Sequence, residues 1–193
     1  MTRTHRAYDQ LRKPPSGAGR HTRMMWVVDA LWSAFCDEGY SWVGFYLPAA
    51  DAPAVTSVHA IDVDKTEATD VVRADPSQPH VTEPSMELGP RRDKPACSPI
   101  GMHGVCGQSF TRGVVRIVTD VALLGQDYIA CDPNDRSEIV LPMFDGATVT
   151  GVLDIDSRDV DAFDGYDAES LLSLLKRVGL TDRSDVPIEW TSS

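Results

Sequence analysis

The chain has 193 residues, of which 42% are hydrophobic and 24% charged, and this composition excludes a chain that is disordered throughout. Eighteen basic residues against 29 acidic ones give a formal net charge of -11. Such a surface repels phosphate backbones and anionic lipid headgroups, which argues against nucleic acid and membrane as partners. No apolar run reaches the ~20 residues that cross a bilayer, and the N-terminal residues lack the apolar core that a secretory signal would have. We therefore expect a cytoplasmic protein with reduced thiols.

The N-terminal residues differ in charge from the rest of the chain. Residues 1 to 23 contain one acid, Asp9, and six basic side chains: Arg3, Arg6, Arg12, Lys13, Arg20 and Arg23. The run from Pro14 to Gly19 breaks any helix, so residues 1 to 21 are predicted to form a flexible basic arm. One domain is expected over residues 22 to 179, followed by a polar tail over 180 to 193.

The first predicted elements are a helix and a strand. Apolar residues recur at helical spacing from Met24 to Phe35, which predicts one amphipathic helix. The aromatic and β-branched run over 41 to 47 predicts a buried strand, and a second strand is predicted over 55 to 61. Residues 62 to 85 are rich in Asp, Glu and Pro with few apolar positions, so we interpret them as an acidic surface insertion.

The middle of the chain is dense in turn-forming residues. Glycines and prolines over 94 to 107 predict an irregular segment, followed by a short helix that ends at Arg112. Residues 114 to 118 predict a strand, and residues 120 to 136 a loop that contains Cys131.

The last third of the domain carries the strongest hairpin signal. Two runs of strand-forming residues, 138 to 144 and 149 to 156, flank Asp145-Gly146 and predict an antiparallel pair. Leucines on a helical period over 163 to 178 predict a closing helix. These elements together predict an α+β domain with a mainly antiparallel sheet.

Three acids fall in this hairpin. Asp154 and Asp156 share one face because side chains alternate along a strand, and Glu138 begins the partner strand. One interpretation is a solvent-facing strand edge. The other is a site that binds an ammonium group or shares a proton, since crowded carboxylates raise each other's pKa.

Cys97, Cys106 and Cys131 lie in loop-like segments, whereas Cys36 lies in a predicted helix and is interpreted as structural. In a reducing compartment, three loop cysteines indicate either redox chemistry or a metal site. The redox hypothesis has one thiol attack and the others form disulfides with it. The metal hypothesis adds His103 to the three cysteines, but it lacks the Cys-x2-Cys spacing typical of structural zinc, and we predict no metal.

Six short blocks in this order resemble the GAF-domain enzymes called free methionine-(R)-sulfoxide reductases: Trp42 to Leu47, Lys94 to Cys97, Gly104 to Gly107, Ile129 to Asp132, Ser137 to Pro142 and Gly151 to Ser157. The resemblance extends to about Leu174. It implies a GAF fold, in which a six-stranded, mainly antiparallel sheet flanked by helices encloses a pocket for free methionine sulfoxide. Members of the family are often homodimers, and no cofactor is implied.

The resemblance also implies roles for single residues. Cys131 is the catalytic cysteine, and Cys97 and Cys106 are the resolving cysteines. The residues implied in substrate binding are the three acids and two aromatic residues: Glu138, Asp154, Asp156, Trp42 and Tyr46. For the two aromatic residues, packing in the core is the alternative.

The implied reaction is the reduction of free L-methionine-(R)-S-oxide to methionine. The Cys131 thiolate attacks the sulfoxide sulfur, while one protonated acid supplies a proton to the oxygen. The resulting sulfenic acid condenses with a resolving thiol, and a thioredoxin-like dithiol reduces the disulfide. The alternative function is a non-catalytic GAF module that binds a small ligand for sensing.

The chain departs from the family pattern in four ways. It has one residue fewer between its first two loop cysteines and one more between the second and third. Asp127-Tyr128 replaces a Gly-His pair before Ile129. Residues 51 to 85 exceed the family's short hairpin connection, and the N-terminal helical region is shortened.

Overall fold

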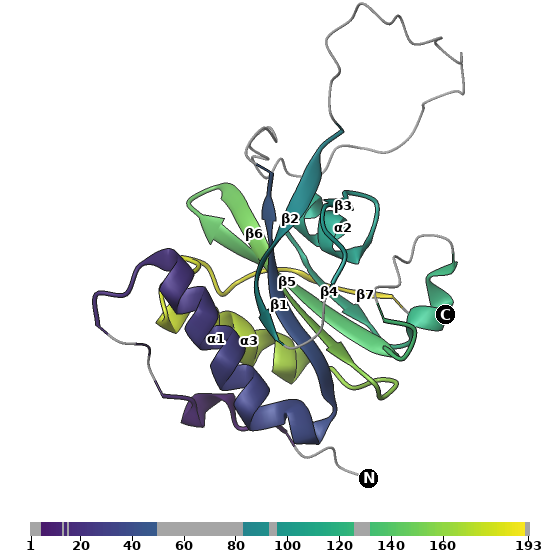
Figure 1. Cartoon of the computed structure of the whole chain (residues 1–193), viewed down its shortest axis with the longest axis horizontal. Helices are drawn as coiled ribbons and strands as arrows, with labels where there is room; N and C mark the ends of the chain where they lie inside the picture. The colour runs from purple at the N-terminus through teal and green to yellow at the C-terminus, as the bar shows by residue number, and fades with distance from the viewer. Residues whose placement is uncertain are drawn as a thin grey trace, which may run out of the picture.

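The computed structural model describes residues 5–12, 14, 16–49, 83–92, 96–125 and 132–191. Its centre is one sheet with the strand order β3-β2-β1-β6-β5-β4-β7 (Figure 1). The strands are β1 (Tyr40–Pro48), β2 (Ser85–Arg92), β3 (Ile100–Gly101), β4 (Val115–Val118), β5 (Ser137–Asp145), β6 (Thr148–Ser157) and β7 (Ile188–Thr191). The pairs are antiparallel apart from β4 with β7, which is parallel.

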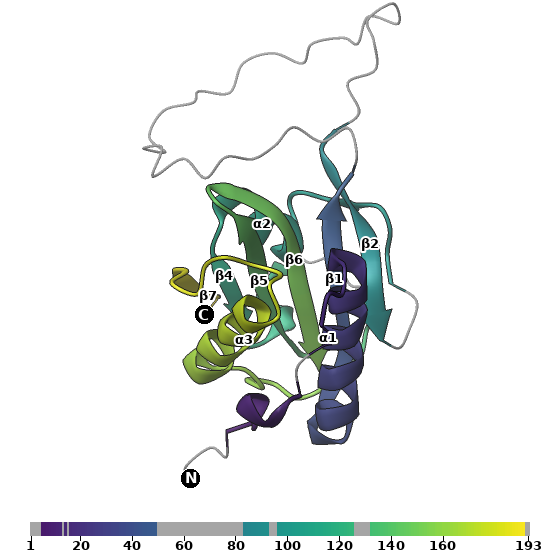
Figure 2. The same ribbon diagram turned by 90° about the vertical axis from the view of Figure 1, so that its left-hand side faces the viewer.

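Helices cover both faces of this sheet. Figure 2 shows α1 (Arg20–Phe35) and α3 (Gly165–Arg177) on one face and α2 (Val105–Arg112) on the other. Short 3-10 turns complete the described elements: η1 (Tyr8–Gln10), η2 (Cys36–Glu38) and η3 (Val121–Leu123). None of the helices in the described ranges has the length and apolar character needed to span a bilayer.

The two long helices confirm the predicted periodic segments. α1 buries Met24, Val28 and Leu31 on its sheet side. α3 begins in a capping box, in which the Asp164 carboxylate accepts hydrogen bonds from the backbone of the first turn, and the Asp167 carboxylate accepts one from the Asp164 amide. These bonds satisfy donors that have no partner inside the helix and so fix where α3 starts.

The β5–β6 hairpin is also confirmed. Asp145 pairs with Thr148, and Gly146 has a φ of 58°, a left-handed conformation that glycine adopts without steric cost. Leu153 and Ile155 are fully buried on the α1 and α3 side. Asp154 and Asp156 alternate with these two residues along the strand and therefore project to the opposite face, beneath α2.

The sheet has seven strands where the family resemblance implied six. The strand β2 lies in residues for which no strand was predicted, because their pattern is polar and includes Gly89 and Pro90. The predicted strand over 55 to 61, and the insertion up to residue 82, lie outside the described residues. In the predicted polar tail, Leu180 and Val186 are buried, and β7 pairs with β4. This tail is therefore part of the domain.

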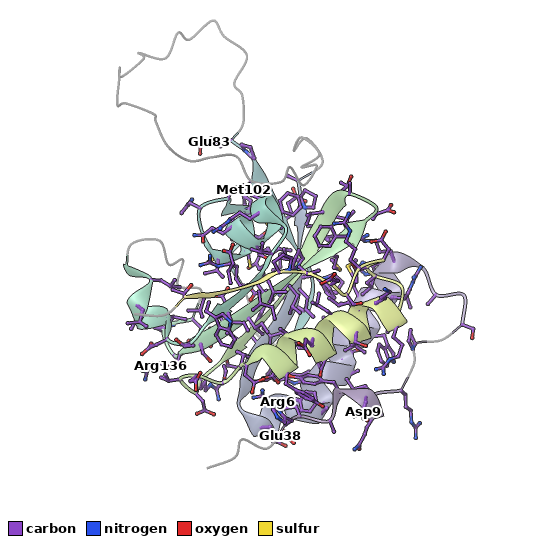
Figure 3. The ribbon with its side chains drawn as sticks, turned by 180° about the vertical axis from the view of Figure 1, so that it is seen from behind. Arg6, Asp9, Glu38, Glu83, Met102 and Arg136 are labelled. Carbon is purple, nitrogen blue, oxygen red and sulfur yellow. The ribbon has the colours of Figure 1, made fainter. Side chains whose placement is uncertain are left out.

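The N-terminal segment packs on the domain, which differs from the flexible basic arm that the run from Pro14 to Gly19 predicted. Tyr8 is 2% exposed, and its hydroxyl donates a 2.6 Å hydrogen bond to Asp167 and lies 2.7 Å from the Tyr40 hydroxyl. Arg6 donates to Asp167 at 3.2 Å and lies over the Tyr40 ring. Figure 3 shows Arg6 close to Glu38. The sequence pattern does not reveal that the buried Tyr8 ring and the Arg6–Asp167 ion pair hold this segment in place.

Candidate active site

The strand register brings the predicted acids to one place on the sheet. Glu138 on β5 lies opposite Asp156 on β6, and Trp42 on β1 lies on the other side of Asp156. Gly44 lies opposite Asp154. Since cross-strand partners project to the same face, these residues line the face that α2 covers.

The first turn of α2 adds a thiol to this face. Gly107 allows the helix to approach the preceding turn, because a Cβ there would collide with the backbone of Met102. Cys106 is buried, and its Sγ donates a hydrogen bond to Asp154 Oδ2 at 3.2 Å. The ligating atoms of Cys106, Glu138 and Asp154 lie within 4.8 Å of one another.

These three side chains are each 6% exposed, and this burial disfavours their charged forms. Burial, followed by the nearby Asp154, raises the pKa of the Cys106 thiol well above its usual range. Burial and the Asp154 charge also raise the pKa of Glu138 well above its usual range. Burial raises the pKa of Asp154 to about 7, although its hydrogen bond from Cys106 opposes the shift. Burial therefore favours the protonated form of Glu138, and Asp154 titrates near neutral pH.

One oxygen of the cluster has no partner. Asp154 Oδ1 is buried and accepts no hydrogen bond within the described part of the chain. Most buried polar atoms in proteins are hydrogen-bonded, so an exception in a cluster of acids marks an acceptor for a ligand's donor. An ammonium group has the charge and the donors to fill it.

A buried hydrogen bond supports the cluster from the side. Ser41 Oγ donates to Asp135 Oδ1 at 2.6 Å, and this bond joins the start of β1 to the segment before β5. The Asp135 charge raises the pKa values of Glu138 and Asp154. Sequence reasoning missed this pair because the two residues are 94 positions apart and no local motif links them.

Arg116 on β4 is the second residue that the sequence analysis missed. It lies opposite Val140, so it projects to the same face as Glu138, and its charge lowers the pKa of that acid. Its guanidinium donates to Glu189 at 3.1 Å and to Thr191 at 2.8 Å, both on β7. In the sequence, the signal for this role was a single charged residue between the apolar residues Val115 and Ile117 of a predicted strand.

The two predicted aromatic residues lie beside the acids. Trp42 is 3% and Tyr46 2% exposed, with ring centroids 6.0 Å apart. The Trp42 indole lies over Gly44, where any Cβ would collide with it. The Tyr46 hydroxyl donates to the backbone oxygen of Cys97 at 3.0 Å. This bond ties the Cys97 segment to the aromatic side of the cluster.

The predicted cysteines have different outcomes. Cys131 lies outside the described residues, so its catalytic role stays a prediction. Cys97 is exposed, Cys106 is buried, and both are free thiols, as is Cys36. His103 is exposed. Among the residues that the structure describes, the group with metal-ligating geometry is Cys106 with two carboxylates, and neither Cys97 nor His103 joins it.

Sequence comparison finds characterised relatives, although no family model matches the chain. The free methionine-R-sulfoxide reductase of Saccharomyces cerevisiae is 42% identical over 106 residues, which cover 51% of this chain and 58% of that protein. The enzyme of the same name from Escherichia coli is 38% identical over 96 residues, covering 49% and 57%. The matches thus span less than two thirds of these relatives.

Solved structures extend the similarity over most of the chain. The free methionine-R-sulfoxide reductase of Neisseria meningitidis, in complex with its substrate, has a TM-score of 0.62 and 29% identity over 84% of this chain and 77% of that one. The reduced fRMsr of Staphylococcus aureus has a TM-score of 0.67 and 27% identity, covering 92% and 97%.

The sheet and its helices define a GAF fold of the α+β class, as the sequence resemblance implied. Within that class, the resemblance to the free methionine-R-sulfoxide reductases that the six sequence blocks indicated is confirmed.

Proposed function

We propose that this protein is an enzyme that reduces free L-methionine-(R)-S-oxide to methionine. The observation that carries the proposal is the buried group of Cys106, Glu138 and Asp154, in which one carboxylate oxygen has no partner. The names of the relatives, which are free methionine-R-sulfoxide reductases, support the same substrate.

The substrate's ammonium group would bind the acids. Asp154 Oδ1 is the acceptor without a partner, and Asp156 projects from the same face one pleat further along β6. The sulfoxide's methyl and methylene groups would pack on Trp42 and Tyr46, which offer buried ring surface next to the acids.

In the proposed reaction, the Cys131 thiolate attacks the sulfoxide sulfur, and Glu138 is suited to supply a proton to the oxygen because burial raises its pKa and favours its protonated form. Methionine leaves, and the oxygen remains on Cys131 as a sulfenic acid. The thiol of Cys106 or Cys97 then condenses with it, which forms a disulfide and releases water. A thioredoxin-like dithiol reduces that disulfide. A homodimer and a cytoplasmic location belong to the same proposal.

The test compares kcat/KM for free methionine-(R)-sulfoxide with that for its N-acetyl form and for a short peptide. Both replacements turn the ammonium into an amide, which removes charge-assisted hydrogen bonds worth about 1.5–3 kcal/mol each. Loss of two such bonds predicts a decrease of roughly two to four orders of magnitude. Equal values for the three substrates would mean that the acids do not bind the ammonium.

The matched variants are Cys131→Ser and Cys36→Ser. We expect the first to abolish methionine release, because it removes the attacking thiol. We expect the second to match the wild type, because Cys36 lies at the end of α1, on the sheet face opposite the acids. Similar activity in both variants would contradict the assignment. Binding of free methionine sulfoxide without methionine release by the wild type would favour the sensory module.

A further inference from the structure

We propose that Cys106, Glu138 and Asp154 bind a divalent, thiol-seeking cation such as Zn²⁺ when the protein is reduced, and that this cation excludes the substrate. The site is the same one that the proposed function assigns to the ammonium group, so the exclusion of substrate rests on that function. The metal binding itself does not.

The geometry of the three side chains fits a zinc ion. Zn²⁺ binds sulfur at about 2.3 Å and carboxylate oxygen at about 2.0–2.2 Å, which puts tetrahedral ligand atoms roughly 3.5 Å apart. Cys106 Sγ and Asp154 Oδ2 are 3.2 Å apart, and a Glu138 oxygen completes a set within 4.8 Å. Side-chain movements of about 1 Å would bring the three ligand atoms to bonding distance of an ion, and a water molecule would take the fourth position.

The unpartnered oxygen independently indicates a missing ligand. Asp154 Oδ1 is buried without a hydrogen bond, so the carboxylate has a free acceptor within this set. The neighbouring cation, Arg116, is engaged by Glu189 and Thr191 on β7. A cation that enters the cluster therefore finds an acceptor that the described side chains leave unused.

The ion binds the thiolate form of Cys106, so its binding displaces the thiol proton. The other charged groups whose fields reach the cluster are Asp135 before β5, Asp156 on β6 and Arg116 on β4. A disulfide to Cys106 removes the thiolate ligand, so oxidation expels the cation. Only the reduced protein would bind the metal.

The test uses Co²⁺ with the full-length reduced protein, because a cobalt–thiolate bond gives a charge-transfer absorption band in the near ultraviolet. We expect one Co²⁺ per chain and a band that Zn²⁺ displaces. Cys106→Ser should abolish the band, and Asp154→Asn should weaken Zn²⁺ binding at least tenfold. Cys97→Ser and Cys36→Ser are the matched controls and should keep it.

A band that survives Cys106→Ser, or that Cys97→Ser removes, would overturn the proposal. If Cys106→Ser does not fold, alkylation of the wild type decides: Zn²⁺ should slow modification of Cys106 but not of Cys97, and equal rates would refute the site. None of these readouts uses turnover. A Cys106-dependent band without methionine release would reject the proposed function alone, and turnover without a band would reject the metal site alone.

Discussion

Asp167 and Asp154 are both buried carboxylates in the same domain, yet their surroundings differ. Asp167 Oδ1 accepts from the Tyr8 hydroxyl at 2.6 Å and from Arg6 at 3.2 Å, and Oδ2 accepts from the Asp164 amide at 3.0 Å. Asp154 Oδ2 accepts from a buried thiol, and its Oδ1 has no partner in the described ranges. The first acid is paired with a cation, and the second faces other acids.

The difference separates a structural acid from a functional one. A buried carboxylate with a cation and several donors recovers its lost hydration, so it holds elements together. A buried carboxylate that lies among other acids, with no cation paired to it, recovers less of its hydration, and the protein is less stable for containing it. Such a group persists where a ligand completes its bonding, which is why the acids beneath α2 are the candidate site and Asp167 is not.

The largest expected effect comes from removing the charge of Asp167, the structural acid. Asp167→Asn keeps the shape but removes the charge, so Arg6 is left without its counter-ion and Tyr8 with a weaker acceptor. We expect the free energy of unfolding to fall by about 3–5 kcal/mol in urea titrations. Glu169→Gln, on the exposed side of the same helix, is the control and should change it by less than about 0.5 kcal/mol. A loss below 1 kcal/mol for Asp167→Asn would remove the contrast between the two acids.

The next effect concerns the pH dependence of stability. Asp154 has a pKa of about 7 in the folded chain, well above that of an exposed aspartate, so folding takes up a proton between these values. Stability therefore falls as pH rises from about 4 to about 7, by up to about 4 kcal/mol for a shift of roughly three units. Asp154→Asn should flatten this slope and be more stable than the wild type at pH 8.

Asp185→Asn, an exposed change in the C-terminal segment, controls for net charge and should leave the slope unchanged. Urea titrations at pH 5 and pH 8 measure both variants. An Asp154→Asn slope equal to that of the wild type would show that this carboxylate does not hold the extra proton.

The smallest expected effect tests how Arg116 acts on Glu138 at the edge of the acidic cluster. Glu189→Gln removes the counter-ion of Arg116, whose positive charge then acts more strongly on Glu138 and lowers the pKa of that acid further. The alkaline limb of the pH profile of kcat/KM should move to lower pH, with about a threefold loss at pH 8. Glu87→Gln, exposed on β2, should leave the profile in place. A Glu189→Gln profile that moves to higher pH would contradict the role of Arg116.

Local signals made much of this architecture predictable. The β5–β6 hairpin follows from alternation around Asp145-Gly146, and the shared face of Asp154 and Asp156 follows from the same alternation. β2 and β7 were not predictable, because these strands are defined by their pairing partners more than by their own residues. Ser41, Asp135 and Arg116 act through contacts between segments far apart in the sequence. The burial of Tyr8 was not predicted, because the residues around it in the sequence are charged.

Trp42 gives the native chain a fluorescence reporter at the site. The chain has four tryptophans, and Trp26 and Trp32 lie on α1 at the opposite face of the sheet, while Trp190 is 47% exposed on β7. Trp42 is the one whose indole lies over Gly44, next to the acids. A change in its emission, obtained by subtracting the spectrum of Trp42→Phe, therefore reports occupancy of the cluster. Binding of an amino acid or a metal ion can be followed without a label.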